Sequence, residues 1–499
     1  NKVIAKSEKN SAFNANSTVS LFEHTEIEIP DVKTWTSEHP NLYKLLMYIK
    51  DGDKIVEMVP FNIGFRRIEI KPIEQKAANG QPDICLFING QPLKLKGVNI
   101  HEHNPATGHY VPEDLMRRDF ELMKQHNLNS VRLCHYPQDR RFYELCDEYG
   151  LYVYDEANIE SHGMYYDLRK GGTLGNNPEW LKPHMDRTIN MFERNKNYPS
   201  VTIWTLGNEA GNGYNFYQTY LWLKEADKNI MARPVNYERA QWEWNSDMYV
   251  PQYPGADWLE SIGKNGSDRP VAPSEYAHAM GNGPGDLEDY FELIHRYDGM
   301  CGGFIWEWCD HAVYQGQAAN GKEKYLYGGD FGEEVHDGNF CMDGLVYPDR
   351  TPHTGLKELK NVNRPARIVS FCQETREAVI RNYLDFTNLK EYASVAWEVT
   401  CDGVCIADGV LEGAAMPDIL PHGEAAVRLD FQVPEAGKCF LKLRYIRRES
   451  TRLTEAGTEL GFDEILLKNE DGRNQTALRM LERCGKACAD RNQSSPFTV

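Results

Sequence analysis

The sequence predicts a multidomain protein in which a (β/α)8 TIM barrel is flanked by immunoglobulin-like β-sandwich domains. Three observations support this fold class. The chain has 499 residues, too many for one hydrophobic core. Residues 73–364 alternate strand-like and helix-like segments, which is typical of a parallel sheet wrapped by helices. Short alternating runs separated by turn residues fill the two flanks, as in β-sandwiches.

The flanking segments differ in completeness. Residues 1–72 contain the runs "HTEIEIP", "LYKLLMYI" and "IVEMVPFNIGFRRIEI", which predict part of an immunoglobulin-like sandwich. Residues 365–470 contain "ARIVSFCQE", "AVIRNYL", "ASVAWEVTCDG", "AAVRLDFQVP" and "KCFLKLRYI", enough for a whole sandwich. Residues 471–499 form a polar tail or linker with one short helical pattern, Leu478 to Cys484.

The middle block contains a regular series of strand candidates. In chain order they are "LKLKGVNI", "NSVRLCHY", "GLYVYDEAN", "SVTIWTLGNE", "RPVNYE", "SDMYVPQY", "RPVAPSEY" and "MCGGFIWEW". Between the first two, "PEDLMRRDFELMKQHN" places Met116, Phe120 and Met123 at i, i+4 and i+7, on one face of a helix. Four later connectors have the same character. Their number and total length match a TIM barrel.

Composition narrows the range of functions. A net charge of -19 argues against a nucleic-acid partner, because phosphate binding needs a basic surface. The sequence has no run of 18 apolar residues that would span a membrane, and no signal peptide is visible. The 12 scattered cysteines indicate buried free thiols in a reducing compartment, so we expect a cytoplasmic protein. A neutral or cationic small molecule is the expected partner, and homo-oligomerisation is left open.

Polar residues gather directly after the predicted strands, where TIM barrels carry their chemistry. Glu209 follows the fourth strand in "WTLGNEAGNG", and Glu275 ends the seventh in "APSEYAHAMGN". After the first three strands come His101 and His103, then His135, then Glu156, Asn158, Glu160 and His162. Any one of these could be an ordinary solvated loop residue. Together they predict one functional rim.

Two glutamates on opposite walls of one barrel mouth suit glycoside hydrolysis. One carboxyl group protonates the departing oxygen, and the other attacks the sugar or activates water. Because strands four and seven face each other across a barrel, a separation near the retaining distance of about 5 to 5.5 Å is expected. The residues therefore predict a glycosidase before any likeness to a known family is considered.

Residues 35 to about 470 resemble the β-galactosidase branch of glycoside hydrolase family 2. The segments "WTSEHPNLY" and "GFRRIEI" resemble the entry from sandwich to barrel in that family. Seven further segments resemble successive barrel motifs of the family, namely "KGVNIHEHNP", "RLCHYP", "DEANIESHGM", "TLGNEAGNG", "SEYAHAMGN", "GGFIWEWCD" and "FCMDGLVYPDRTPH". One such segment would be weak evidence, but the ordered series is specific. The resemblance implies a retaining enzyme that cleaves terminal β-D-galactosides such as lactose through a covalent galactosyl-enzyme.

The resemblance also implies roles for individual residues. Glu209 matches the acid/base and Glu275 the nucleophile. Substrate-binding roles are implied for His101, His135, Asn208, Tyr253, His278 and Trp306. Asn208 matches a ligand of the sugar 2-hydroxyl, Tyr253 a phenol that hydrogen-bonds the nucleophile, His278 a group near the 6-hydroxyl, and Trp306 an aromatic platform under the galactose ring.

Two metal ions are implied in the same way. Glu160, His162 and Glu209 match ligands of Mg²⁺, which prefers oxygen donors, so Zn²⁺ is the less suitable rival. Na⁺ would be held by the Phe340 carbonyl and by Asp343, where the family has an asparagine. That departure puts the sodium site in doubt.

The resemblance leaves several alternatives open. Relative to the family, the N-terminal jelly-roll domain and most of the large C-terminal β domain are not recognised, so we expect a fragment. The same chemistry on another sugar, such as a β-glucuronide, is one alternative function. A non-catalytic carbohydrate-binding remnant is the other, although the presence of both glutamates argues against it.

Overall fold

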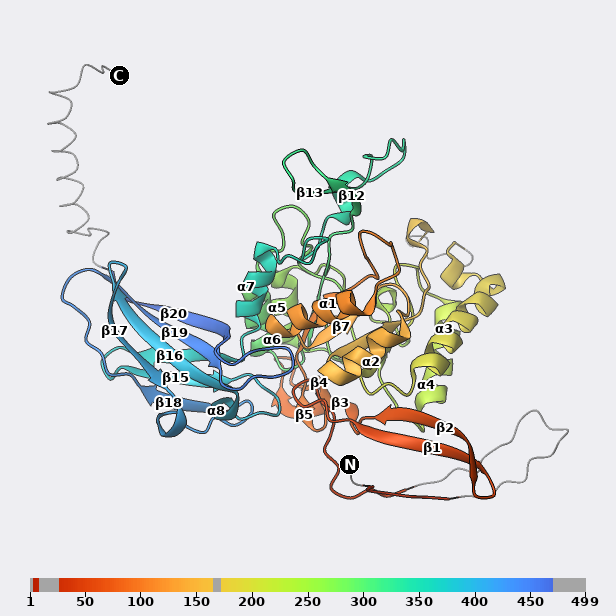
Figure 1. Ribbon diagram of the computed structural model, residues 1–499, viewed down its shortest axis with the longest axis horizontal. Helices are drawn as coiled ribbons and strands as arrows, with labels where there is room; N and C mark the ends of the chain where they lie inside the picture. The colour runs from red at the N-terminus through yellow and green to blue at the C-terminus, as the bar shows by residue number, and fades with distance from the viewer. Residues whose placement is uncertain (1–2, 9–26, 165–171, 470–499) are drawn as a thin grey trace, which may run out of the picture.

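The computed structural model describes residues 3–8, 27–164 and 172–469. Its centre is a parallel sheet in the order β10-β9-β8-β7-β6-β11 (Figure 1). These strands are β6 (Leu95–Asn99), β7 (Ser130–Arg132), β8 (Tyr152–Glu156), β9 (Val201–Thr205), β10 (Val235–Asn236) and β11 (Gly302–Ile305). They correspond to six of the eight predicted strands. The predicted tail, including the helical pattern from Leu478 to Cys484, lies outside the described residues.

Two extended segments close the barrel between β10 and β11. The Asp247 amide donates to the Val235 carbonyl at 2.8 Å, which continues the sheet from β10. Tyr249 then forms a parallel bridge with Val271, and Val271 forms another with Met300 just before β11. These segments are the sixth and seventh predicted strands, reduced here to isolated bridges. The predicted TIM barrel is therefore confirmed.

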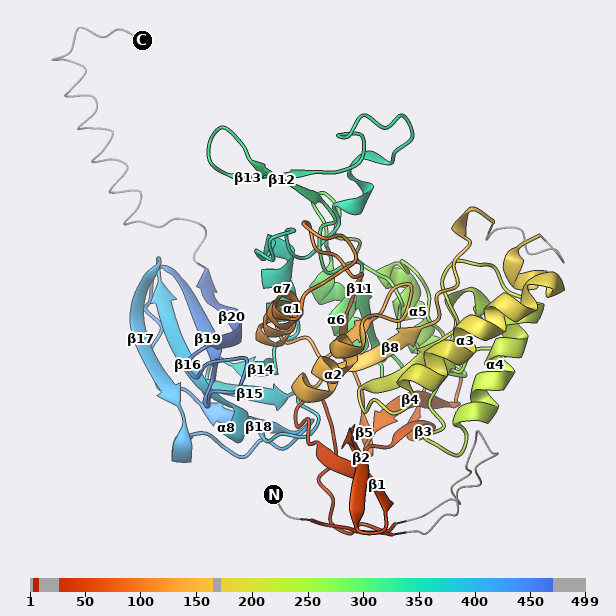
Figure 2. The ribbon, with the colours of Figure 1, turned by 45° about the vertical axis from the view of Figure 1, so that its right-hand side comes forward.

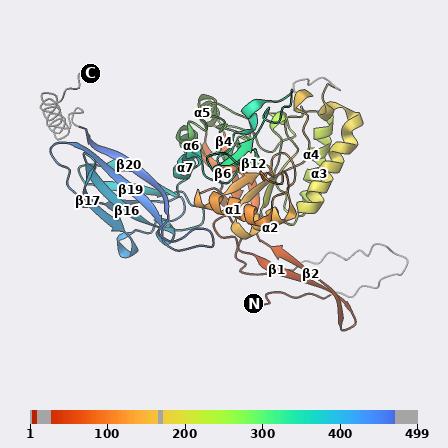
Figure 3. The same cartoon turned by 45° about the horizontal axis from the view of Figure 1, so that its top comes forward.

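Helices surround the sheet, as Figure 3 shows from a tilted view. They are α1 (Glu113–Gln125), α2 (Arg140–Tyr149), α3 (Leu181–Asn195), α4 (Tyr214–Asp227), α5 (Ala256–Asn265), α6 (Leu287–Arg296) and α7 (Thr354–Val362). The predicted apolar face of α1 is confirmed, since Met116, Phe120 and Met123 are buried. Short 3₁₀ turns include η1 (His162–Met164), η2 (Leu174–Asn176), η3 (Pro178–Trp180), η4 (Glu238–Ala240) and η5 (Gly338–Cys341). None of the helices in the described part of the chain combines the length and apolar character needed to cross a bilayer.

A small antiparallel sheet covers the N-terminal end of the barrel (Figure 2). It consists of β3 (Ile68–Lys76), β4 (Pro82–Ile88) and β5 (Gln91–Pro92). Its apolar residues share one core with side chains inside the barrel, where Leu86 and Ile88 join Tyr154, Ile203 and Phe304. Buried apolar contact on this scale closes that end of the barrel and leaves the opposite rim for chemistry.

The N-terminal flank is a hairpin of β1 (Tyr43–Asp51) and β2 (Lys54–Ile63). Apolar residues such as Met47 and Val56 are exposed, and no second sheet faces the hairpin among the residues described. The described end of the "HTEIEIP" run, from Ile27, forms no strand. The sandwich boundary at residue 72 stays a prediction, and β3 crosses it.

The C-terminal flank is a two-sheet sandwich. One sheet contains β14 (Ala366–Cys372), β15 (Glu377–Asn382) and β18 (Glu424–Arg428). The other contains β16 (Ala393–Cys401), β17 (Val404–Leu411), β19 (Lys438–Arg447) and β20 (Glu459–Asn469), with α8 (Leu389–Tyr392) and η6 (Gly413–Ala415) between strands. Ile380 from the first sheet packs in one core with Val395 and Leu441 from the second. A further hairpin, β12 (Val313–Gln317) and β13 (Glu323–Leu326), rises above the barrel rim (Figure 1).

The cysteines only partly follow the sequence expectation. All ten in the described ranges are free thiols. Six are buried, but Cys372 and Cys405 are exposed, so the expectation that the thiols are buried is wrong for these two. Both lie on strands of the C-terminal sandwich, which offers solvent-facing positions that the barrel strands do not.

Candidate active site

The two predicted catalytic glutamates lie on the same rim of the barrel. Glu209 follows β9, and Glu275 ends the seventh extended segment, where it bridges Gln252 in parallel. Glu209 has a φ of 40°, a left-handed conformation that is uncommon for a residue other than glycine. Such backbone conformations gather at functional sites, where the surrounding structure holds them in place. The geometry therefore marks Glu209 as specifically positioned.

Arg132, at the end of β7, is the hub of the site and is fully buried. Its guanidinium donates to both oxygens of buried Glu156, from Nε at 2.9 Å and from Nη2 at 3.0 Å. It also donates to Glu275 Oε1 at 2.8 Å, Asn99 Oδ1 at 2.9 Å and Asn208 Oδ1 at 2.9 Å. Burial lowers the pKa of Arg132, but Glu156 and Glu275 outweigh it and raise that pKa overall. One arginine thus fixes a nucleophile candidate and a sugar-binding candidate together.

Three donors converge on the Glu275 carboxylate. Besides Arg132, Gln252 Nε2 donates to Oε1 at 3.0 Å, and the Tyr253 phenol also hydrogen-bonds Glu275. Burial and the nearby Glu275 charge raise the pKa of Tyr253, so its phenol stays protonated and able to donate. A carboxylate held by three donors has a fixed orientation, as a nucleophile requires.

Glu209 has a different environment, which suits an acid. Burial, followed by the charge of Glu275, raises its pKa above the usual value for glutamate. His162 Nδ1 contacts its Oε2, and Arg239 Nη2 donates to its Oε1 at 2.7 Å. The Glu209 amide donates to buried Glu238. Two carboxyl groups in unlike environments, one with a raised pKa, are what acid and nucleophile roles need.

Aromatic rings line the wall between the first, second and eighth strands. His135 stacks on Trp306 with ring centroids 5.3 Å apart and planes at 11°. His101 meets both of these rings edge-on, at 5.3 Å and 5.8 Å. Burial and the Arg132 charge lower the pKa of His135 to about 3, so the ring is neutral and Nδ1–H donates to Glu156 at 2.8 Å. The acceptor nitrogen Nε2 then faces Asn208 Nδ2 at 3.4 Å, which joins His135 to the second sugar-binding candidate.

Asp343 organises the opposite part of this wall. It is buried, and its Oδ2 accepts from Trp306 Nε1 at 2.8 Å and interacts with His278 Nε2 at 3.2 Å. Burial and the neighbouring Asp343 raise the pKa of buried Glu307 well above its usual value. Phe340 is exposed, and its ring meets His278 edge-on at 5.8 Å. The carboxylate of Asp343 thus orients the predicted platform, and its sodium role stays a prediction.

The predicted magnesium ligands lie together. Oxygen and nitrogen atoms of Glu160, His162 and Glu209 fall within 4.8 Å of one another. Asn208 Nδ2 donates to Glu160 Oε2 at 3.1 Å, so the group adjoins the sugar-binding candidates. Two carboxylates and one imidazole, partly open to solvent, fit a hard divalent cation that keeps several waters.

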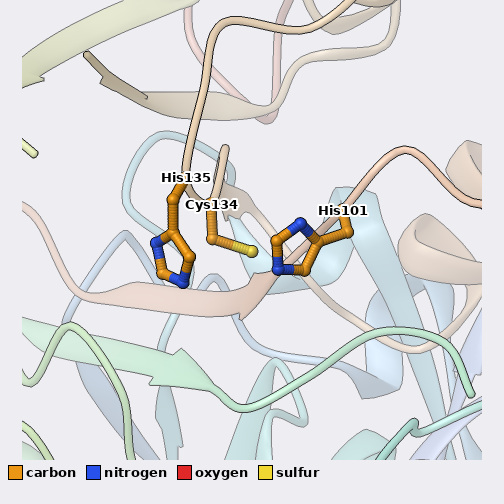
Figure 4. Close-up of side chains that lie close together, drawn as sticks. All are labelled: His101, Cys134 and His135. Atoms are coloured by element: carbon orange, nitrogen blue, oxygen red, sulfur yellow. The ribbon is translucent and has the colours of Figure 1, made fainter. Parts of the chain in front are cut away.

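A second cluster within the same 4.8 Å limit consists of His101, Cys134 and His135 (Figure 4). Its thiol points toward the His101 ring, but Cys134 is fully buried, and burial raises its pKa well above the ordinary value. Because the thiolate is the metal-binding form, a protonated thiol makes a poor ligand. We interpret this cluster as packing beneath two candidate sugar-binding histidines.

The sequence did not predict the residues that position the candidate catalytic and sugar-binding side chains. Arg132, Gln252, Glu238, Arg239 and Glu307 all contact the site. Arg132 carried a signal, since a charge inside the apolar run "SVRLCHY" must find a buried partner. Of the other rim residues, His103 Nε2 approaches the Ala312 carbonyl at 3.1 Å and Asn158 is exposed.

Three family models match this chain. Residues 82–368 match the model described as glycosyl hydrolases family 2, TIM barrel domain. Residues 378–468 match beta-galactosidase, domain 4, and residues 1–66 match a further glycosyl hydrolases family 2 model. A solved β-glucuronidase from Ruminococcus gnavus has the same fold, with a TM-score of 0.51 and 22% identity over 66% of this chain and 58% of that chain.

Curated relatives are more similar in sequence. The β-galactosidase of Actinobacillus pleuropneumoniae is 38% identical over 482 residues, covering 90% of this chain and 45% of the relative. That of Klebsiella pneumoniae is 38% identical over 426 residues, covering 80% of this chain and 39% of the relative. The chain thus spans less than half the length of these relatives. The barrel-domain model matches more than half of this chain, and the relatives are 38% identical over most of it. The chain therefore belongs to glycoside hydrolase family 2.

Proposed function

We propose that this chain carries the catalytic part of a retaining β-galactosidase acting on terminal β-D-galactosides such as lactose. The observation that carries the proposal is the unlike pair of glutamates on one rim. Glu209 has a raised pKa, whereas Glu275 is held by Arg132, Gln252 and Tyr253. Relatives named β-galactosidase, at 38% identity, support the choice of sugar.

The proposed reaction has two displacements. In the first, a Glu275 oxygen bonds to the anomeric carbon as the bond to the leaving oxygen breaks, and Glu209 gives its proton to that oxygen. In the second, Glu209 takes a proton from water, whose oxygen attacks the anomeric carbon and displaces Glu275. Two inversions restore the β configuration. Asn208 and the acceptor nitrogen of His135 would hold sugar hydroxyl groups, and Trp306 would lie under the ring.

Glu160, His162 and Glu209 would hold Mg²⁺ in this proposal. The cation would supply positive charge that orients Glu209 and shifts its proton affinity. Na⁺ would be held by the Phe340 carbonyl and by Asp343, whose Oδ2 also accepts from Trp306 Nε1 at 2.8 Å. The free cysteines among the described residues support a reducing compartment, so we place the protein in the cytoplasm.

A β-glucuronide is the alternative substrate. Asp343 argues against it, because a buried carboxylate beside His278 would repel a sugar carboxylate in a pocket for the 6-position. Rates on paired 4-nitrophenyl β-D-galactoside and β-D-glucuronide test this choice. A higher kcat/KM on the glucuronide would refute the proposed substrate.

A non-catalytic remnant and an inverting enzyme are tested separately. Glu209→Gly should depress turnover most with poor leaving groups, and azide should restore part of it by entering the vacated space. Proton NMR of the first-formed sugar should show the β anomer. Initial α anomer would exclude a glycosyl-enzyme, and a wild-type chain inactive on every aryl glycoside would support the remnant.

A further inference from the structure

We propose that Cys401 and Cys439 form a reversible dithiol–disulfide site in the C-terminal sandwich. The oxidant is of the hydroperoxide class, and hydrogen peroxide is the probe. The two residues lie on β16 and β19, outside the barrel, so the inference is independent of the proposed glycosidase activity. Both are free thiols in the structure, which is the reduced form of such a site.

The strand register places the two cysteines directly opposite each other. β16 lies between β17 and β19, and Cys401 of β16 pairs with Cys439 of β19 in antiparallel register (Figure 2). Cys401 ends β16, and the two residues that follow, Asp402 and Gly403, have φ angles of 50° and 80°, which suit a two-residue hairpin turn. Turn type and loop length fix the register of a hairpin, so this turn holds Cys401 at the end of β16.

The two cysteines form a non-hydrogen-bonded pair, the kind in which opposite residues lie closest. The next pair along the ladder is the hydrogen-bonded kind, since the Asp402 amide donates to the Lys438 carbonyl at 2.9 Å. The two kinds alternate along an antiparallel ladder, and non-hydrogen-bonded pairs have Cα atoms about 4.5 Å apart. Disulfides join residues whose Cα atoms are about 4.4–6.8 Å apart. The backbone therefore already has the spacing that a disulfide needs.

The side chains bring the two thiols into contact. The Cys439 thiol hydrogen-bonds Cys401, and the Cys401 thiol donates to the Ala436 carbonyl at 3.6 Å. Gly437 leaves the space that the Cys401 sulfur occupies, since an added Cβ there would lie 2.5 Å from that sulfur. A bond between the two sulfur atoms thus requires side-chain rotation rather than backbone movement.

The two thiols differ in exposure, which assigns them different parts in the reaction. Cys401 is partly exposed, whereas Cys439 is fully buried in the core of the sandwich. Burial and the contact with Cys401 raise the pKa of Cys439 to about 11, so its thiol stays protonated at neutral pH. Cys401 is therefore the sulfur that meets the oxidant, and Cys439 is the sulfur that closes the disulfide.

One hydroperoxide forms one disulfide. The Cys401 sulfur attacks a peroxide oxygen: an S–O bond forms, the O–O bond breaks, and the leaving hydroxide takes the Cys401 proton to give water. The Cys439 sulfur then attacks the Cys401 sulfur of this sulfenic acid. The S–S bond forms, the S–O bond breaks, and the departing hydroxide takes the Cys439 proton. In total the two thiols lose two electrons and two protons, and hydrogen peroxide is reduced to two waters.

Peptide mapping of the parent chain tests for this bond. Trypsin cuts after lysine and arginine, which leaves Cys401 in peptide 391–428 and Cys439 in peptide 439–442. After treatment with one equivalent of hydrogen peroxide and alkylation of the remaining thiols, a non-reducing digest should contain these two peptides joined, with the loss of two hydrogen atoms. Dithiothreitol should separate them. The total of 12 thiols, titrated in denaturant, should fall by two.

Two variants identify the sulfur atoms that react. Cys401→Ser should abolish the joined peptides. Cys405→Ser is the matched control and should leave them unchanged, since Cys405 is exposed on β17 and pairs with Thr400 rather than with a thiol. Recovery of peptide 439–442 with Cys439 alkylated from the oxidised parent would overturn the inference. Loss of the joined peptides in Cys405→Ser would overturn it as well, because the bond would then involve the wrong thiol of peptide 391–428.

Discussion

Replacing Arg132 by methionine tests whether a buried charge organises the site. The substitution removes two hydrogen bonds to Glu156 and one each to Glu275, Asn99 and Asn208. Arg132 and Glu156 are both buried, so the change leaves an uncompensated carboxylate in the barrel. Breaking a buried ion pair from one side costs about 3–5 kcal/mol. We expect the free energy of unfolding, measured with urea, to fall by that amount.

A double variant separates stability from catalysis. Arg132→Met combined with Glu156→Gln removes the charge of Glu156, the more buried of the two carboxylates that lose Arg132, so at least half of the lost stability should return. Activity should not return, because Glu275 still lacks the Arg132 donor among its three. A hydrogen bond to a charged group contributes about 1.5–3 kcal/mol, which corresponds to about 10- to 150-fold in kcat/KM. If the double variant were no more stable than the single one, or recovered full activity, the central role assigned to Arg132 would be refuted.

Three further predictions concern other parts of the molecule. Chelation should lower activity reversibly, with Mg²⁺ restoring it, and Glu160→Gln should weaken that response; an enzyme indifferent to chelators would remove the metal from the proposal. Burial raises the pKa of Asp147 from its ordinary value to about 7, so the folded state loses stability as pH rises between those two values and the whole loss is present above pH 7; Asp147→Asn should be more stable than the parent at pH 8 but not at pH 4, by urea unfolding. An added Cβ at Gly97 would lie 2.3 Å from Phe304 Cδ1, so Gly97→Ala should lower the free energy of unfolding by about 1–3 kcal/mol, and an unchanged urea midpoint would contradict that packing argument.

Much of the barrel was predictable from local pattern. Apolar runs and amphipathic helices arise from residues adjacent in sequence, and α1 shows the agreement, with Phe120 buried on its predicted face. The sixth and seventh strands were located correctly, but their reduction to isolated bridges depends on neighbouring chain segments. The strands β17 and β20 were not predicted as separate runs. Both are partly exposed, which blurs the alternation that marks a strand.

The site was predictable where function demands particular residue types after strands. Glu209 and Glu275 are such residues, and the structure places both on one rim. Their supporting partners were not predictable, because Arg239 reaches Glu209, and Gln252 reaches Glu275, from the neighbouring strand of the barrel. Such contacts join segments far apart in the chain, and no spacing in the sequence reports them. Glu238 shows the same limit, since its burial depends on the assembled fold.

The sheet of β3, β4 and β5 has a kinetic consequence for the proposed reaction. It fills the N-terminal end of the barrel with the apolar side chains of Leu86 and Ile88, so traffic through that end is blocked. Substrate, departing alcohol and incoming water must then all pass through the C-terminal rim of the barrel. Water reaches the glycosyl-enzyme only after the first product clears that rim, and any sugar lingering there competes with water as an acceptor. In the proposed reaction, a barrel open at one end therefore makes the glycosyl-enzyme divide between reaction with water and transfer to another sugar.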